Sequence, residues 1–192
     1  MKFDNQSSGD LFIPAESSLE EVITKDREDL RKMYGSFEEI ADRMTQFIMQ
    51  IETQIAPARM KRRAEVFRDW GFNHDELLDL PGSITKEGTI AYLVCQDICK
   101  IFNTPEIFPG EKEIAFIDSL HTRGFQECPF KKCTKGLSSS DYQIQNTRTG
   151  RELYINDMTA HLARDHELLE KGNKYGISAK EFYQHFMPSQ RD

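Results

Sequence analysis

The amino-acid sequence predicts a mostly α-helical fold with a small α+β part toward its C-terminal end. Two patterns support this prediction. Over the first 120 residues, apolar residues recur at helical spacing behind Ser-x-x-Glu motifs. After residue 140 they alternate with polar residues on both sides of a turn sequence, which is typical of a β-hairpin. We therefore expect a flexible tail (1–17), a helical domain (18–122) and a hairpin–helix module with a returning C-terminal helix (123–192).

Two capping boxes predict the first helices. Ser18 with Glu21 opens a helix that runs to about residue 34, and Ser36 with Glu39 opens the next. The second helix carries a longer apolar stripe, which is the face that a core would bury. Its members are Phe37, Ile40, Met44, Phe47, Ile48, Ile51 and Ile55.

Further helices are expected before the hairpin. Pro57 stands where a new helix can begin, and the helical pattern continues over 59–70. The strongly apolar stretch 84–102 predicts a buried helix, and residues 111–121 predict another that ends before Gly124.

The C-terminal module combines two strands with two helices. The strands are predicted around 142–144 and 153–155, on either side of the turn at 147–150. A helix follows over about 158–170, and a capping box formed by Ser178 and Glu181 opens the last helix.

Composition and charge limit the function classes. The chain has 192 residues and a net charge of −7, so its overall field does not attract nucleic acid. The charge is −9 over residues 1–120 (14 basic, 23 acidic) and +2 over 121–192 (11 basic, 9 acidic). No run of 18 apolar residues predicts a membrane span, and the N-terminus has no secretory h-region. Four cysteines in such a chain are expected to be reduced thiols or metal ligands, in a cytoplasmic protein.

Cys128, Cys133, His161 and His166 form a pattern that suits a tetrahedral zinc ion. The cysteines lie on a short loop ahead of the predicted hairpin, and the histidines lie on the helix after it. Lys131 and Lys132, between the cysteines, favour the thiolate form that a ligand requires. Four protein ligands close the coordination sphere, so the predicted site is structural and its binding energy is folding energy.

This order of cysteine loop, hairpin and histidine helix resembles the Cys2His2 zinc finger, over residues of about 125–171 only. Met158 lies three residues before His161, where such fingers place an apolar core residue. The spacings are wider than in the family: four residues separate the cysteines and 27 separate Cys133 from His161. The resemblance implies a zinc-bound hairpin–helix module, which we expect to be joined to the helical N-terminal domain.

The fourth ligand is open at this point. His161 and His166 are five residues apart, about 140° on an ideal helix, so both reach one ion only if the helix widens or frays between them. Asp165 lies on the face of His161 and is either an alternative ligand or a partner that orients an imidazole.

A basic cluster gives a second candidate surface, and three function hypotheses follow. The cluster consists of Arg59, Lys61, Arg62 and Arg63, joined by Lys131 and Lys132. It predicts contact with phosphates or with an acidic partner, whereas a solvated helix face is the simpler interpretation. The leading hypothesis is a zinc-stabilised adaptor that recognises a protein partner. The alternatives are a regulatory nucleic-acid-binding protein and a metal-dependent hydrolase.

Overall fold

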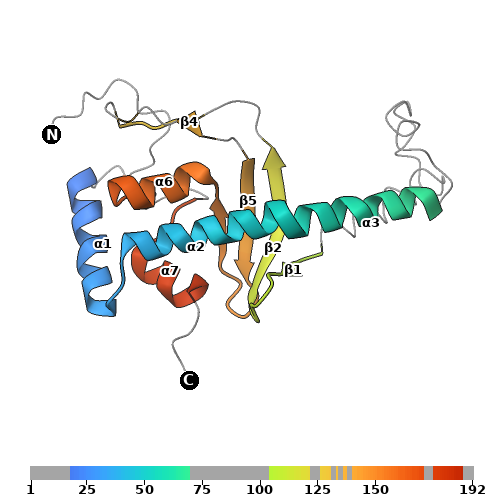
Figure 1. The fold of residues 1–192 in the computed structure, drawn as a ribbon. Helices are drawn as coiled ribbons and strands as arrows, with labels where there is room; N and C mark the ends of the chain where they lie inside the picture. The colour runs from blue at the N-terminus through green and yellow to red at the C-terminus, as the bar shows by residue number, and fades with distance from the viewer. Residues whose placement is uncertain are drawn as a thin grey trace, which may run out of the picture.

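The computed structural model describes residues 18–69, 104–121, 126–130, 133, 136–137, 140–170 and 175–187. The expected tail (1–17), the apolar helix predicted over 84–102, and Lys131 and Lys132 lie outside these ranges. Within them the fold is mixed α+β (Figure 1). The described helices are α1 (Leu19–Met33), α2 (Phe37–Gln50), α3 (Ala56–Asp69), α6 (Asp157–His166) and α7 (Ala179–Phe186), with a π-helical segment, η1 (Ile51–Ile55), between α2 and α3.

The first two helices confirm the predicted capping boxes. The side chain of Ser18 accepts a hydrogen bond from the Glu21 N–H, and the Glu21 carboxylate accepts one from the Ser18 N–H. Ser36 and Glu39 repeat this exchange at the start of α2. Each box satisfies backbone donors that a helix start leaves without partners. Helix α1 ends at Met33, where Tyr34 adopts a left-handed conformation at φ 56°, and α2 begins at Phe37 behind the second box.

The π-helical segment joins α2 and α3 into one long rod (Figure 1). The Ala56 N–H donates to the carbonyl of Ile51, five residues back, instead of the usual four. The next residue, Pro57, has no N–H to donate, and its ring would collide with the carbonyl four residues before it in a regular α-helix. The wide turn accommodates that proline. The helix therefore continues through Pro57, where the sequence had predicted a new start.

The main sheet has four antiparallel strands in the order β1-β2-β5-β6. They are β1 (Glu106–Ile107), β2 (Ile114–His121), β5 (Ser140–Asn146) and β6 (Glu152–Ile155). The β5–β6 hairpin confirms the predicted pair, with Tyr142 opposite Ile155 and a turn that contains Gly150 at φ +72°.

The helix predicted over 111–121 is wrong, because residues 114–121 form strand β2. The pattern was misleading since Ile114, Ala115 and Phe116 are all buried, which hides the alternation expected of a strand. A bulge between Phe116 and Asp118 then shifts the pairing register with β5. Strands β2 and β5, which lie on either side of the domain boundary expected at residue 122, therefore pair in one sheet.

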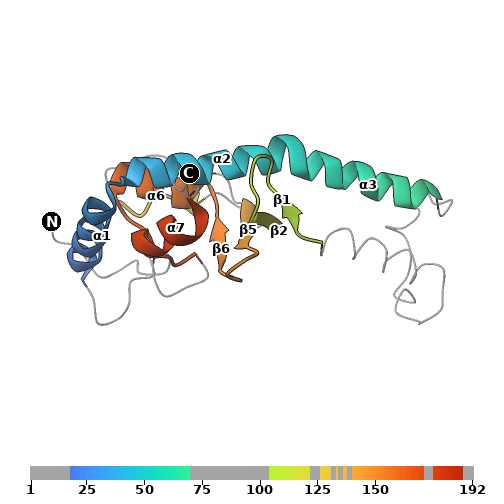
Figure 2. The ribbon, with the colours of Figure 1, turned by 90° about the horizontal axis from the view of Figure 1, so that it is seen from below.

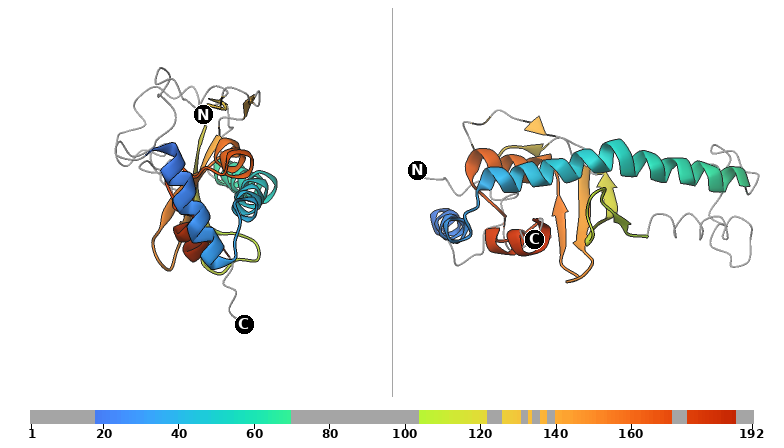
Figure 3. Two further views of the ribbon diagram at one scale, coloured as in Figure 1. Left: turned by 90° about the vertical axis from the view of Figure 1, so that its left-hand side faces the viewer. Right: turned by 60° about the horizontal axis from the view of Figure 1, so that its bottom comes forward.

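The main core lies between α2 and the sheet. Figures 2 and 3 show α1, α6 and α7 gathered near the first half of the long helix, while α3 extends beyond the strands. Phe47 from α2 packs on Phe108 at a ring-centroid distance of 4.6 Å. Other members of this core are Ile40, Met44, Ile144, Leu153, Ile155, Phe182 and Phe186.

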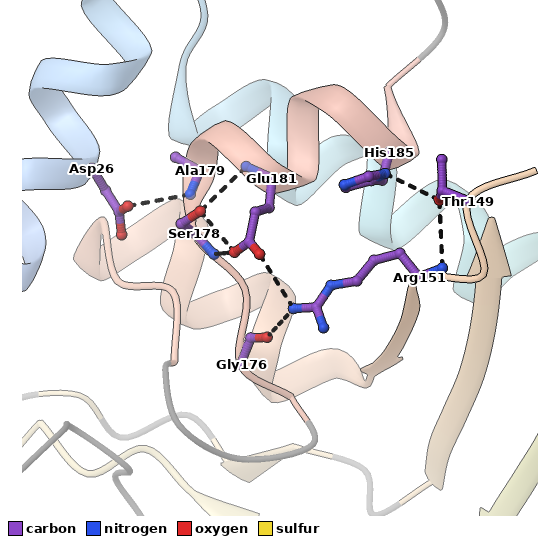
Figure 4. A network of polar contacts seen from close by, with 8 residues as sticks. All are labelled: Asp26, Thr149, Arg151, Gly176, Ser178, Ala179, Glu181 and His185. Carbon is purple, nitrogen blue, oxygen red and sulfur yellow. Dashed lines mark hydrogen bonds and ion pairs between the residues drawn. The ribbon is translucent and has the colours of Figure 1, made fainter.

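The start of α7 confirms the third predicted capping box and connects three parts of the fold (Figure 4). The backbone N–H of Ser178 donates to the Glu181 carboxylate, and this hydrogen bond lowers the pKa of Glu181. Arg151, next to β6, lies 3.8 Å from the same carboxylate. From α1, the buried Asp26 accepts a hydrogen bond of 3.2 Å from the Ala179 N–H.

We expect replacement of Gly35 by alanine to destabilise the fold by about 1–3 kcal/mol, because overpacking forces neighbours to move. A Cβ at this position would lie 2.2 Å from Oη and 2.3 Å from Cζ of Tyr183. That hydroxyl accepts a hydrogen bond from the Ser36 N–H and donates one to Glu39. Urea denaturation would measure the cost. In a Tyr183→Ala background the same change should cost far less, and an equal cost in both backgrounds would contradict this explanation.

Candidate metal centre

The two cysteines lie on a loop closed by a small hairpin of its own. Strands β3 (Gln126–Glu127) and β4 (Gly136–Leu137) pair antiparallel, with Glu127 opposite Gly136. Cys128 follows β3 directly. The Cys133 N–H donates a 2.8 Å hydrogen bond to the carbonyl of Phe130, which turns the chain between the two thiols. Both sulfur atoms are thereby presented from one tight loop.

The two histidines come from α6, which begins immediately after β6. Asn156 caps the helix, because its side chain accepts from the Thr159 N–H at 2.8 Å. The Asn156 amide also donates to the buried Asp141 of β5 at 2.8 Å, so the helix start is attached to the main sheet. His161 lies in the second turn of α6, and His166 is its last residue.

Helix α6 ends in a left-handed cap directly after His166. Glu167 adopts a left-handed conformation at φ 52°, and its N–H donates to the carbonyl of Leu162, five residues back. The Leu168 N–H donates to that same carbonyl at 3.1 Å. These two bonds are those of a common helix end. The rings of His161 and His166 lie with centroids 5.0 Å apart. The helix ends earlier than predicted, at 166 instead of about 170.

Four donor atoms converge. Sγ of Cys128 lies 3.2 Å from Nε2 of His166, and Sγ of Cys133 lies 3.3 Å from Nε2 of His161. All four ligand atoms lie within 4.8 Å of one another. Around a tetrahedral zinc ion, with bonds of about 2.0–2.3 Å, neighbouring donors are separated by about 3.3–3.8 Å. A thiol–imidazole hydrogen bond would explain the short distance within each cysteine–histidine pair. It would not explain why the two pairs lie next to each other.

Asp165 lies on the far side of the His161 ring from the sulfurs. Its Oδ2 is 2.7 Å from Nδ1 of His161, whereas Nε2 is the atom that faces Cys133. The pair is a close contact between ionisable groups and not an aligned hydrogen bond. A carboxylate beside Nδ1 leaves Nε2 facing the sulfurs, where an ion would bind. Of the two roles that the sequence left open for Asp165, the geometry matches the orienting partner.

The surroundings of the donor atoms are apolar and include residues that the sequence did not point to. The ring of Phe130 stacks on His166 at 3.9 Å and 2°. Val22 of α1 packs in the same cluster as Cys128 and Met158, the apolar position expected from the resemblance. Burial raises the pKa of the Cys128 thiol, and an ion would bind it in its deprotonated form. The proximity of Phe130 to the donor atoms could be inferred from its position between the cysteines in the chain. Nothing in the sequence linked α1 to the cysteines.

The long spacer between the cysteines and histidines has a structural explanation. The hairpin that carries the cysteines is β3–β4, whereas the predicted hairpin, β5–β6, belongs to the main sheet. The finger-like unit is therefore β3–β4 together with α6, and the β5–β6 hairpin is inserted between them. That insertion accounts for most of the 27 residues between Cys133 and His161.

The basic cluster does not form one exposed surface in the described part of the chain. Arg59 is only 3% exposed and donates to Glu106 at 2.6 Å, with further bonds to the carbonyls of Thr104 and Ile117. Arg62 pairs with the same Glu106 carboxylate. Lys61 is exposed and Arg63 is half-buried. The contact predicted for these residues stays a prediction, and Arg59 is turned into the fold.

We expect Asp165→Ala to weaken zinc binding about ten- to a hundredfold while one ion per chain still binds, because it removes the orienting carboxylate. Asp165→Asn, which keeps an oxygen acceptor, should lose less. Competition with a chromophoric chelator would measure the affinity, with Arg164→Gln on the same helix as the control. Loss of the ion in Asp165→Ala combined with its retention in His166→Ala would show instead that Asp165 is the ligand.

Comparisons with known proteins add no relative. No family model, no curated protein and no solved structure matches this chain. Among the helices described here, none is both long enough and apolar enough to cross a bilayer.

Proposed function

We propose that this protein binds one structural zinc ion through Cys128, Cys133, His161 and His166, and serves as an adaptor that recognises a protein partner. The observation that carries the proposal is the convergence of the four donor atoms within 4.8 Å of one another. Two thiolates and two imidazoles suit zinc, and four protein donors leave no coordination position for a substrate. A metal site without an open coordination position supports a structural role for the ion. The function that we assign to the fold it stabilises is binding.

A protein partner fits the described surface better than a nucleic acid does. Arg59 and Arg62 are both engaged with Glu106, and the whole chain carries a net charge of −7. Met49 and Met60 are 58% and 52% exposed on the long helix. Methionine side chains adapt their shape to apolar partners, which suits a protein-binding face.

Metal analysis of the purified full chain tests the first half of the proposal. We expect one zinc per chain in the wild type and none in His161→Ala after dialysis against a weak chelator. An absence of metal from protein that was refolded with zinc present would overturn the metal site.

A comparison of captured proteins tests the second half. Met49→Glu/Met60→Glu should lose specific partners that the wild type and Gln54→Glu, an exposed control in η1, retain. In parallel, the anisotropy of labelled DNA and RNA oligonucleotides should show no binding at physiological salt. Binding that falls steeply as salt rises would favour the nucleic-acid alternative.

A further inference from the structure

Helix α1 contributes to two separate apolar clusters. Near its start, Val22 belongs to a small cluster beside the metal donors, which we call the metal-side cluster: Val22, Cys128, Met158, Leu162 and Leu168. Leu19 and Ile23 pack against it. Near its end, Leu30 belongs to the main core between α2 and the sheet, and Met33 packs against that core. The two halves of α1 therefore depend on different parts of the fold.

The part of the metal-side cluster that comes from the cysteine loop has little support of its own. Its hairpin, β3–β4, consists of two residue pairs, and a two-stranded hairpin of this size is not stable alone in water. Cys128 is in the cluster, and Phe130 and Cys133 pack against it. Their positions beside α6 depend on the link between the sulfurs and the imidazoles, which the ion would provide.

Among the residues that the structure describes, the other anchors of α1 begin at its third turn. Asp26 accepts a hydrogen bond from the Ala179 N–H (Figure 4), and Leu30 is buried in the main core. Arg27 pairs with Glu167 at the end of α6, but both side chains are about half exposed. Exposed ion pairs contribute little to stability. The first two turns, residues 19–25, are therefore held mainly by the metal-side cluster.

We propose that zinc occupancy controls the docking of the first two turns of α1, and that this docking in turn sets the affinity for zinc. The inference rests on the proposed metal site. Zinc holds the cysteine loop against α6, and the loop completes the apolar surface that Val22 covers. Without the ion the loop separates, and residues 19–25 lose their apolar support while Leu30 and the main core stay in place. The coupling is reciprocal, because two linked binding equilibria must shift each other by the same factor.

Hydrogen exchange of the full-length protein with and without a strong chelator tests the first direction. We expect chelation to speed exchange of the amides at 22–25 about tenfold or more, the change that a loss of about 1.4 kcal/mol of local stability produces. Amides within α2, between Met44 and Ile48, should exchange at the same rate in both samples. Equal protection of α1 in zinc-bound and chelated protein would overturn the proposal.

A matched pair of substitutions tests the other direction. Val22→Glu places a charge in the metal-side cluster, whereas Thr24→Glu adds the same charge at an exposed position of the same helix. We expect Val22→Glu to weaken zinc binding about tenfold, as loss of one buried side chain's packing would, and Thr24→Glu to leave it unchanged. Val22→Ala should have an intermediate effect, and unaltered α2 exchange would show that each variant is folded.

The outcomes separate this inference from the proposed function. If the wild type holds no zinc, the metal site itself is wrong. If the wild type, Val22→Glu and Thr24→Glu hold one zinc each with equal affinity, the site stands and the coupling to α1 is overturned.

Discussion

Replacing Cys128 by serine is expected to abolish tight zinc binding, whose total free energy in a structural site of four protein ligands is on the order of 10 kcal/mol. Sγ of Cys128 lies 3.2 Å from Nε2 of His166 and within 4.8 Å of the other two donors, so its loss opens the coordination sphere. Serine is a poor zinc ligand at neutral pH because its hydroxyl does not ionise as a thiol does. The variant should also lose the stability that zinc gives to the metal-side cluster.

Thermal unfolding with and without chelator distinguishes this mechanism from simple misfolding. Chelation should lower the unfolding midpoint of the wild type to about the midpoint of Cys128→Ser. It should leave the variant unchanged, because a ligand stabilises only the form that binds it. Cys95→Ser, which changes a cysteine outside the donor set, should retain zinc and respond to chelator as the wild type does. A Cys128→Ser protein that still holds one tightly bound zinc would contradict the assignment of Cys128 as a ligand.

Arg59→Ala is expected to destabilise the fold by about 3–5 kcal/mol, the cost of breaking a buried ion pair. The guanidinium donates to Glu106 at 2.6 Å and to the carbonyls of Thr104 and Ile117 at 2.9 and 3.0 Å. It also lies 4.3 Å from the ring centroid of Phe116. Alanine would leave two carbonyl oxygens without these donors and a cavity beside the ring.

Urea denaturation of three variants would test this interpretation of Arg59. Arg59→Lys should also be costly, because an ammonium group cannot reproduce the planar arrangement of three separate bonds. Lys61→Ala, at an exposed position of the same helix, should change the unfolding free energy by less than about 0.5 kcal/mol. If Arg59→Ala and Lys61→Ala have equally small effects, Arg59 is available to a partner, as the charge pattern had predicted.

Predictions from the sequence succeeded where the determining contacts are local. The boxes at Ser18, Ser36 and Ser178 were recognised because each is completed by a glutamate three residues away. The β5–β6 hairpin was recognised because its turn and alternating strands adjoin one another in the chain. Cys128, Cys133, His161 and His166, which the structure brings close together, were singled out by residue type and order.

Predictions failed where distant contacts decide the structure. Strand β2 was taken for a helix, because its pairing partner β5 begins nineteen residues after it ends and buries three of its residues in succession. Arg59 was expected at the surface, but its partners Thr104, Glu106 and Ile117 lie 45 to 58 residues along the chain. The charge of a residue predicts that it needs a partner, and it does not reveal whether that partner is internal.

The sequence by itself determined the helix starts and the turn of the β5–β6 hairpin, because these depend on side-chain chemistry within a few residues, and residue type and order pointed to the four residues whose donor atoms come together. Only the tertiary structure decided which hairpin carries the cysteines, where Asp165 lies relative to His161, and that α1 covers the metal-side cluster. The physical reason is that apolar burial is non-directional. The side chain of Val22 could pack against any apolar surface of suitable shape, and only the folded chain shows that this surface lies beside Cys128.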